Sequence, residues 1–308
     1  MLAGAVCPLS TATAQDDYEL IFSDEFNLPD GSRPDPAKWH SCTRHHSTWN
    51  RWISDTLAVA FVKGGHLVCR AIPNPDGSND ATPMLTGAVE TSGLFSFTYG
   101  KVEVRLRTNL HDGNFPAAWM MPQPPCDGWP RAGEIDIFES IDGRKTSFHT
   151  IHSHWTYDLG NKTNPVHAFN RPTTVNQWHI YGLLWTPDSI TWTVDGEAVG
   201  TYPRSTDPEA MANGQWPFDH PFYLILNQSV GDGSWAKNAE TNYTYETHFD
   251  WIRVYQKRNG DDGIRAVTRQ DTSWPTQTDS MFDLCGRRMD RRVQKGVYLL
   301  AGRKVAVR

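Results

Sequence analysis

The pattern of hydrophobic and polar positions predicts a chain built almost entirely of β-strands. Short stretches of alternating or β-branched residues follow one another with turns between them, and a period of two is typical of strands. The only helix that the pattern indicates is a turn or two long, in DPEAMANG at 207–214. The stretches that fit strands are 18–26, 66–72, 92–108, 115–121, 134–140, 148–155, 178–186, 189–202, 221–230 and 249–256.

Strands at such short spacing, with no long helical segment between them, favour an all-β sandwich or barrel. Asp195-Gly196, inside TWTVDGEAV, is the dipeptide that favours a tight hairpin turn. We therefore expect one large β domain over residues 15–257.

The two ends of the chain differ from this body. Residues 1–14 are small and apolar and finish in an Ala-x-Ala pattern, which is typical of a signal peptide and predicts a secreted or cell-surface protein. Residues 258–280 are polar and predict a linker. The basic segment 281–308 contains two apolar bursts and resembles the C-terminal sorting tails of the type IX secretion system. A disordered basic tail is the alternative.

Composition narrows the classes of partner. The net charge of −6 combines +6 in residues 257–308 with −12 in the remainder. An acidic body argues against nucleic acid and highly sulfated polymers, and it suits a neutral substrate. Aromatic residues make up 12% of the chain, with 13 Trp, which predicts a densely packed core together with an aromatic-lined binding surface. No stretch of the expected mature chain is long enough to span a membrane.

Cysteine usage does not indicate a disulfide scaffold or a CxxC metal site. The five cysteines form no CxxC pair, and one of them, Cys7, lies in the predicted signal peptide. This count is too low for a fold held together by disulfides. The sequence leaves open whether a disulfide joins two of Cys42, Cys69 and Cys126.

The segment GEIDIFES, at 133–140, places three carboxylates in an apolar run. On a regular strand Glu134 and Asp136 share one face, whereas Glu139 points to the other. A β-bulge adds one residue and would bring Glu139 back to the face of the other two acids. We therefore predict a bulged strand with three acids on one face.

Three interpretations of that acidic face are open from the residues alone. It can be the solvated face of an amphipathic strand, a cage for a cation, or a pair of carboxyl groups for acid–base and nucleophilic chemistry with a third acid between them. Polar faces normally mix acids with Lys, Thr and Ser, whereas this one carries only acids between turn-rich flanks. That composition favours the catalytic interpretation.

Further stretches carry a resemblance to a known family. They are FSDEF, GKVEVRLRT, FPAAWMMP, GWPRAGEIDIFE, WHIYGLLWTPDSITWTVDG and FDWIRVYQ, in this order over about 18–256. Together they resemble glycoside hydrolase family 16, and GEIDIFE resembles its E-x-D-x-x-E signature in the bulged, laminarinase-like form. The resemblance implies a β-jelly roll of two curved antiparallel sheets with a concave substrate cleft.

The resemblance also implies roles for the three acids. Glu134 would be the nucleophile of a retaining glycosidase, and Glu139 the general acid and then the base. Asp136 would assist between them, and its charge should raise the pKa of a neighbouring carboxyl. No cofactor is implied for catalysis.

Other residues are implied with less support from the sequence itself. The expected substrate contacts are Trp129, His152, Trp235, Asn114, Arg51 and Trp155. Many family members carry a structural calcium, whose ligands would here be Glu25, Gly65 and Asp250, an oxygen set that suits this ion.

The predicted function is a secreted, endo-acting, retaining β-glucanase for β-1,3 or mixed β-1,3/1,4 glucans, acting as a monomer. An endo-galactanase of the porphyranase, agarase or carrageenase type is the alternative. A non-catalytic glucan-binding protein is a remote one, because such proteins lose acids that this chain retains.

Overall fold

The computed structural model describes residues 17–258, 281–282, 288–289, 296–300 and 303–307. The chain divides into two units, Met1–Val267 and Thr268–Arg308. The predicted signal peptide, and all but the first residue of the predicted linker, lie outside the described residues.

The first unit is a nearly all-β structure, as the sequence pattern predicts. Its strands are β1 (Tyr18–Asp24), β2 (His40–Ser41), β3 (Ala60–Lys63), β4 (His66–Pro73), β5 (Met84–Glu90), β6 (Gly100–Thr108), β7 (Asn114–Pro122), β8 (Glu134–Glu139), β9 (Thr146–His152), β10 (Ala168–Pro172), β11 (His179–Trp185), β12 (Ser189–Val194), β13 (Glu197–Pro203), β14 (Phe222–Val230) and β15 (Tyr245–Lys257). The helical elements are η1 (His154–Asp158), a π-helical turn, and α1 (Pro208–Ala212).

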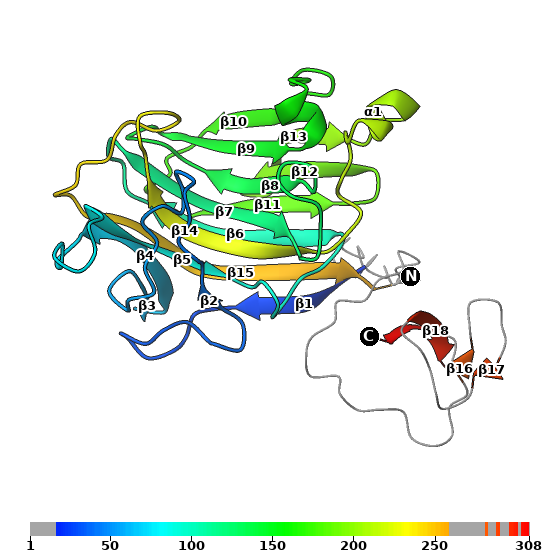
Figure 1. The fold of residues 1–308 in the computed structure, drawn as a ribbon, viewed down its shortest axis with the longest axis horizontal. Helices are drawn as coiled ribbons and strands as arrows, with labels where there is room; N and C mark the ends of the chain where they lie inside the picture. The colour runs from blue at the N-terminus through cyan, green and yellow to red at the C-terminus, as the bar shows by residue number, and fades with distance from the viewer. Residues whose placement is uncertain (1–16, 259–280, 283–287, 290–295, 301–302, 308) are drawn as a thin grey trace, which may run out of the picture. The chain divides into compact units, whose positions relative to one another are not determined.

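The strands join into one antiparallel sheet that folds back on itself (Figure 1). Its order is β10-β9-β8-β7-β14-β5-β4-β15-β6-β11-β12-β13, with β1 on β15, β2 on β5 and β3 on β4. The half that contains β8 faces the half that contains β12, because the Trp192 indole of β12 donates to the Asp136 carbonyl of β8. This curved sheet is the predicted jelly-roll architecture.

Side-chain alternation along the strands builds the core between the two halves. In β6 every second residue is buried, including Val102, Val104 and Leu106. Large aromatic side chains such as Trp185 and Trp192 fill the same space. Much of the aromatic excess in the sequence is therefore core, and burial of these apolar surfaces is the main stabilising term.

The predicted local signals are confirmed. Asp195 and Gly196 connect β12 to β13 and both have positive φ, +52° and +83°, as a tight hairpin turn of this type requires. The short helix α1 lies inside the predicted stretch, and its N-terminus is capped by the Asp207 side chain, which accepts from the Glu209 amide.

The structure also contains strands that the pattern did not predict, namely β2, β3, β5 and β10, and some predicted strands have other bounds. Residues 92–99 were expected to be extended, but positive φ at Gly93 interrupts the strand pattern and β6 begins only at Gly100. The strand expected over 148–155 ends at His152, where η1 follows. Strand β5 was not predicted because Gly87 interrupts its pattern; a Cβ there would lie 1.9 Å from the Val59 carbonyl oxygen, so this close approach of backbones requires glycine.

The described part of the second unit is a four-stranded antiparallel sheet, in the order β17-β16-β18-β19. Its strands are β16 (Met281–Phe282), β17 (Arg288–Met289), β18 (Gly296–Leu300) and β19 (Arg303–Val307). Within the described residues, Cys42, Cys69 and Cys126 are free thiols. Neither helical element in the described residues has the length or the apolar character needed to span a bilayer.

Candidate active site

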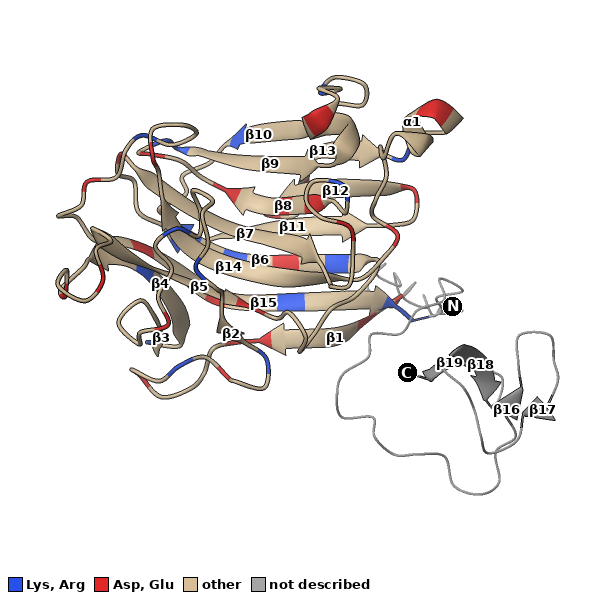
Figure 2. Ribbon diagram, viewed as in Figure 1, with Lys and Arg blue, Asp and Glu red and all other residues tan. Residues whose placement is uncertain are grey.

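Strand β8 contains the predicted bulge. Against β7, Phe138 pairs with Ala118 and Asp136 pairs with Trp119, so Ile137 is the extra residue. The same shift appears against β9, between Asp136 and Glu139. The bulge restores Glu139 to the face that carries Glu134 and Asp136, which we call the site face. Figure 2 shows acidic residues at both ends of β8.

Two buried side chains hold the bulge from the core side. The Trp192 indole donates to the carbonyl of Asp136 at 2.8 Å, and Nδ1 of His149 lies 2.7 Å from the carbonyl of Ile137. Burial lowers the pKa of His149 to about 4, so the ring is neutral at physiological pH. Its Nδ1–H then donates to Ile137, while Nε2 accepts from Ser147. A bulge leaves backbone groups outside the regular ladder, and these side chains satisfy them. Neither residue was predicted from the sequence.

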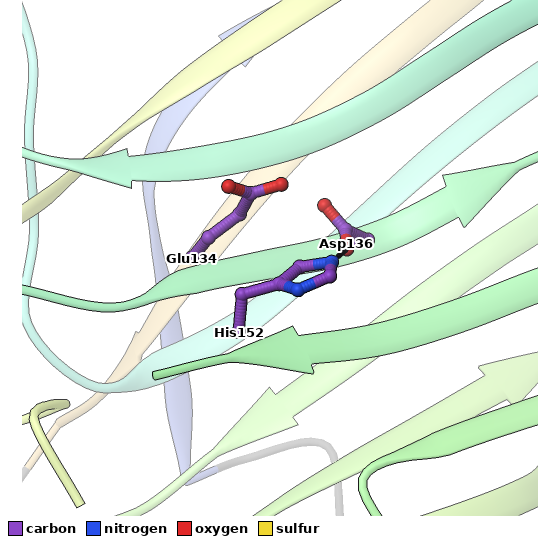
Figure 3. A group of neighbouring side chains, drawn as sticks. All are labelled: Glu134, Asp136 and His152. Carbon is purple, nitrogen blue, oxygen red and sulfur yellow. Dashed lines mark ion pairs between the residues drawn. The ribbon is translucent and has the colours of Figure 1, made fainter. Parts of the chain in front are cut away.

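Glu134, Asp136 and His152 form a compact charged group on the site face (Figure 3). One side-chain donor or acceptor atom from each lies within 4.8 Å of those of the other two. His152, on β9, is paired with Glu134 in the register and places Nε2 3.4 Å from Oδ2 of Asp136. Asp136 is buried, whereas Glu134 and His152 are half-buried. The group therefore opens to solvent on the side of Glu134 and His152.

The environment raises the pKa of Glu134, Glu139 and His152. Burial, with the Asp136 charge, raises the pKa of Glu134 to about 8. Burial and the Asp136 and Glu134 charges raise the pKa of Glu139 well above its usual range. Burial lowers the pKa of His152, but the opposing effect of Asp136, Glu134 and Glu139 is larger. The pKa of His152 is therefore raised to about 9. A protonated His152 next to Asp136 is an ion pair.

The two glutamates differ in the groups that stabilise their anions. The Trp129 indole donates to Oε2 of Glu134 at 2.5 Å, and His152 also favours the Glu134 anion. The His152 charge also favours the Glu139 anion, but no indole donates to Glu139 in the described residues. Burial and the charges of Asp136 and Glu134 disfavour its anion. Glu134 therefore ionises more readily, and Glu139 retains its proton. This difference matches a nucleophile and a general acid.

An aromatic wall stands beside Glu134. Trp129 is 45% exposed, and its ring packs edge-on against Tyr157 of η1, with centroids 4.5 Å apart. His152 lies about 6 Å from both rings. Tyr157 is itself 53% exposed and was not identified from the sequence, because it lies in a turn where a strand was expected to end. Exposed aromatic faces of this kind suit stacking against sugar rings.

The other two predicted tryptophans occupy different surroundings. Trp235 is 49% exposed and packs edge-on against Phe148, which pairs with Glu139 in the β8–β9 register. Trp235 therefore lies at the Glu139 end of the site face, opposite Trp129. Trp155 is half-buried in η1, and its indole donates to the Asn164 carbonyl.

Two predicted substrate contacts have structural surroundings instead. Asn114 is fully buried, and its amide bonds to Thr108, Asn109 and Gln228. This burial contradicts direct contact with substrate. The Arg51 guanidinium donates to the carbonyls of Thr48, Val230 and Gly231 and lies over the Trp52 ring. Arg51 thus joins two loops.

The predicted calcium ligands do not form a cation cage as they are arranged. The Glu25 carboxylate is bound by both ends of the Arg253 guanidinium, each at 2.8 Å. Asp250 is paired with Arg105 and with His66. Each carboxylate already has a cationic partner, so the residues present do not fit a calcium ion. The group of Glu134, Asp136 and His152 is the only cluster of three potential side-chain ligands in the described residues, and its histidine is ion-paired with Asp136.

Comparisons with known proteins agree with this geometry. A family model described as glycosyl hydrolases family 16 matches residues 70–253. The chain is 36% identical over 249 residues to a keratan-sulfate endo-1,4-β-galactosidase of Sphingobacterium multivorum, covering 80% of this chain and 57% of that protein. It is 34% identical over 253 residues to a β-glucanase of Rhodothermus marinus, covering 78% and 85%.

The chain thus spans little more than half of the first relative and most of the second. Among solved structures, the laminarinase of Rhodothermus marinus superposes with a TM-score of 0.69 at 30% identity, covering 78% of this chain and 98% of that one. The matched region contains β8 and the acids of the site face. The chain belongs to glycoside hydrolase family 16.

Proposed function

We propose that the protein is an endo-acting, retaining β-glucanase that hydrolyses β-1,3 or mixed β-1,3/1,4 glucans. The observation that carries the reaction type is the bulge in β8, because it places two glutamates on one face with an aspartate between them. The glucan preference is supported by the relatives named as a β-glucanase and a laminarinase. The apolar pattern of residues 1–14 supports export.

The mechanism uses each acid in a distinct state. Glu134, as the anion favoured by Trp129 and His152, attacks the anomeric carbon and forms a glycosyl-enzyme. Glu139 donates its proton to the leaving oxygen as the glycosidic bond breaks. It then accepts a proton from the water that hydrolyses the glycosyl-enzyme, and Glu134 leaves as the anion. Asp136 stays paired with His152 and raises the pKa of both glutamates.

A second candidate is hydrolysis of β-galactosidic bonds. The relative named as a keratan-sulfate endo-1,4-β-galactosidase is 36% identical, against 34% for the relative named as a β-glucanase. Such a difference does not separate the two substrate classes. The acids of β8 would perform the same reaction on either sugar, so the choice depends on the residues around them.

The test is to assay the purified full chain on laminarin, barley β-glucan, agarose, porphyran and keratan sulfate. We expect release of oligosaccharides from laminarin or barley β-glucan, with products that first appear as the β-anomer by NMR. Cleavage of keratan sulfate alone would replace the glucan proposal with the galactosidic one. Glu134→Gln should lose activity on whichever polymer is cleaved, whereas Glu103→Gln, a change on β6 at a residue paired with Lys101, should retain it.

A further inference from the structure

A row of paired residues crosses the site face from the catalytic strand to another carboxyl group. Asp136 pairs with Trp119 of β7, Trp119 with Ile225 of β14, and Ile225 with Glu90 of β5. Directly paired residues in a sheet point to the same face. Glu90 therefore lies on the site face, three strands from β8, or about 14 Å at ~4.8 Å per strand.

The neighbours of Glu90 confirm that it points to this face. Ala88, two residues earlier on β5, belongs to the small apolar cluster that contains Trp119 and Ile225. Cys42 belongs to the same cluster, and burial together with the Glu90 carboxylate raises the pKa of its thiol. This cluster lies on the site face, whereas the main core lies on the other side of the same strands.

Half-buried side chains connect Glu90 with the catalytic group. Met121 and Tyr223 are paired, and Met121 comes one residue after the Met120–Ile135 pair, beside Glu134. Burial raises the pKa of Tyr223, and the charges of Glu90 and Glu134 contribute to that increase. Tyr223 therefore lies within electrostatic reach of both carboxyl groups. A glycan bound at Glu134 that continues across the sheet would pass Tyr223 toward Glu90.

Glu90 is partly exposed, and its ion-pair partner in the described residues is a histidine. Its side chain is 15% exposed, and its Oε1 lies 3.7 Å from Nδ1 of His40, whose side chain is 47% exposed. Burial raises the pKa of Glu90, against the effects of His40, Cys42 and His45. The described carboxylates elsewhere on the surface often have Arg or Lys partners, such as Glu25 with Arg253. A partly desolvated carboxyl without such a partner has hydrogen-bonding capacity available for a ligand.

We propose that Glu90, with the Tyr223 hydroxyl, forms a sugar-binding position remote from the cleavage centre, which accepts hydrogen bonds from the hydroxyl groups of a neutral sugar and disfavours a sugar that carries a sulfate. The proposal rests on the proposed glycosidase function and adds a substrate class to it. An ionised Glu90 would repel a sulfate, because like charges in a partly desolvated position cost more than in water.

The first test compares substrate lengths in the full chain. Glu90→Ala should lower kcat/KM for a hexasaccharide about tenfold more than for a short aryl glycoside of the same sugar, mainly through KM, because only the longer chain reaches β5. Laminarihexaose serves if laminarin is the polymer cleaved, and a keratan hexasaccharide serves if keratan sulfate is. Glu103→Gln is the charge-matched control. Equal losses on both lengths, or no loss, would overturn the proposal.

The second test addresses charge and needs no turnover. In the Glu134→Gln background, Glu90→Gln should raise the affinity for laminarin sulfate relative to laminarin on the order of threefold, because glutamine keeps an acceptor but removes the charge. An unchanged ratio would refute the sulfate discrimination. If the wild-type protein hydrolyses no polymer, the glycosidase proposal fails, and calorimetry with laminarihexaose then decides on Glu90. Stronger binding by wild type than by Glu90→Ala supports the position, and equal or absent binding rejects it.

Discussion

Replacing Glu134 by Gln should stabilise the fold, and the gain should grow with pH. The pKa of Glu134 is raised from 4.5 to about 8 by burial and by Asp136. A group with a raised folded-state pKa contributes stability that is fully present below its unfolded pKa and is lost as pH rises through the folded one. The wild-type protein therefore loses stability from Glu134 between about pH 4.5 and 8, whereas the Gln variant does not.

The size of the effect follows from the pKa change. One pKa unit corresponds to about 1.4 kcal/mol, so the interval from pH 5 to 8 sets an upper limit of roughly 4 kcal/mol. Glu134 is half-buried and solvent screens part of this energy, so we expect ~2 kcal/mol. The effect on His152 reduces the stability gained by the Gln variant. Its pKa of about 9 gives stability that is present below about pH 6.5, and removing the Glu134 charge weakens that contribution.

The assay is denaturant unfolding of the full chain at pH 5, 6.5 and 8. Glu246→Gln is the control with the opposite sign, because His248 and Arg70 lower the pKa of Glu246 to about 2. The stability that Glu246 provides is present above about pH 4.5. The free energy of unfolding of Glu246→Gln should therefore be lower than that of the wild type by a nearly constant amount from pH 5 to pH 8. A gain for Glu134→Gln that is constant, or that shrinks from pH 5 to pH 8, would refute the assignment of a raised pKa to Glu134.

Three further predictions test the site directly. Glu139→Ala should lower polysaccharide hydrolysis by at least ~10²-fold, and azide should restore turnover of an activated aryl glycoside as the β-azide; the α-azide from this variant would exchange the roles of the two glutamates. Trp192→Phe should lower kcat/KM more than Trp185→Phe, because the Trp192 indole donates to the bulge. The Trp185 indole donates instead to the carbonyl of Phe218, which is not part of the bulge. Equal losses of kcat/KM would contradict a contribution of the bulge to activity. Trp129→Phe should shift the lower limb of the pH–rate profile upward, because the Glu134 anion loses a donor; an unshifted limb would contradict that contact.

The acids of the site could be predicted from the sequence because their conflict is local. Glu134, Asp136 and Glu139 have a spacing that a regular strand cannot place on one face, and a single inserted residue resolves it. Ile137 is that residue in the structure. Trp129 was expected because of the resemblance that GWPRAGEIDIFE carries, and it lies five residues before Glu134.

Residues that act through tertiary contacts could not be predicted in the same way. Asn114 has a polar side chain that suits a sugar, yet the fold buries it against Gln228, more than a hundred residues away. Tyr157 reaches Trp129 only because η1 turns the chain after β9. Whether such a side chain is buried or exposed depends on strand order, and no short pattern encodes it.

The bulge shows why the acids alone do not make the site. It moves Glu139 to the site face, but it also interrupts the ladder at Ile137, so the carbonyls of Asp136 and Ile137 accept from side chains elsewhere. Those donors come from the opposite half of the sheet, through Trp192, and from the buried His149. The same burial that raises the pKa of the glutamates lowers that of His149 to about 4. Above that pH the imidazole is neutral, with one nitrogen donating to the bulge and one accepting from Ser147. Desolvation thus gives Glu139 the proton it needs as an acid and keeps its strand in the geometry where that proton is useful.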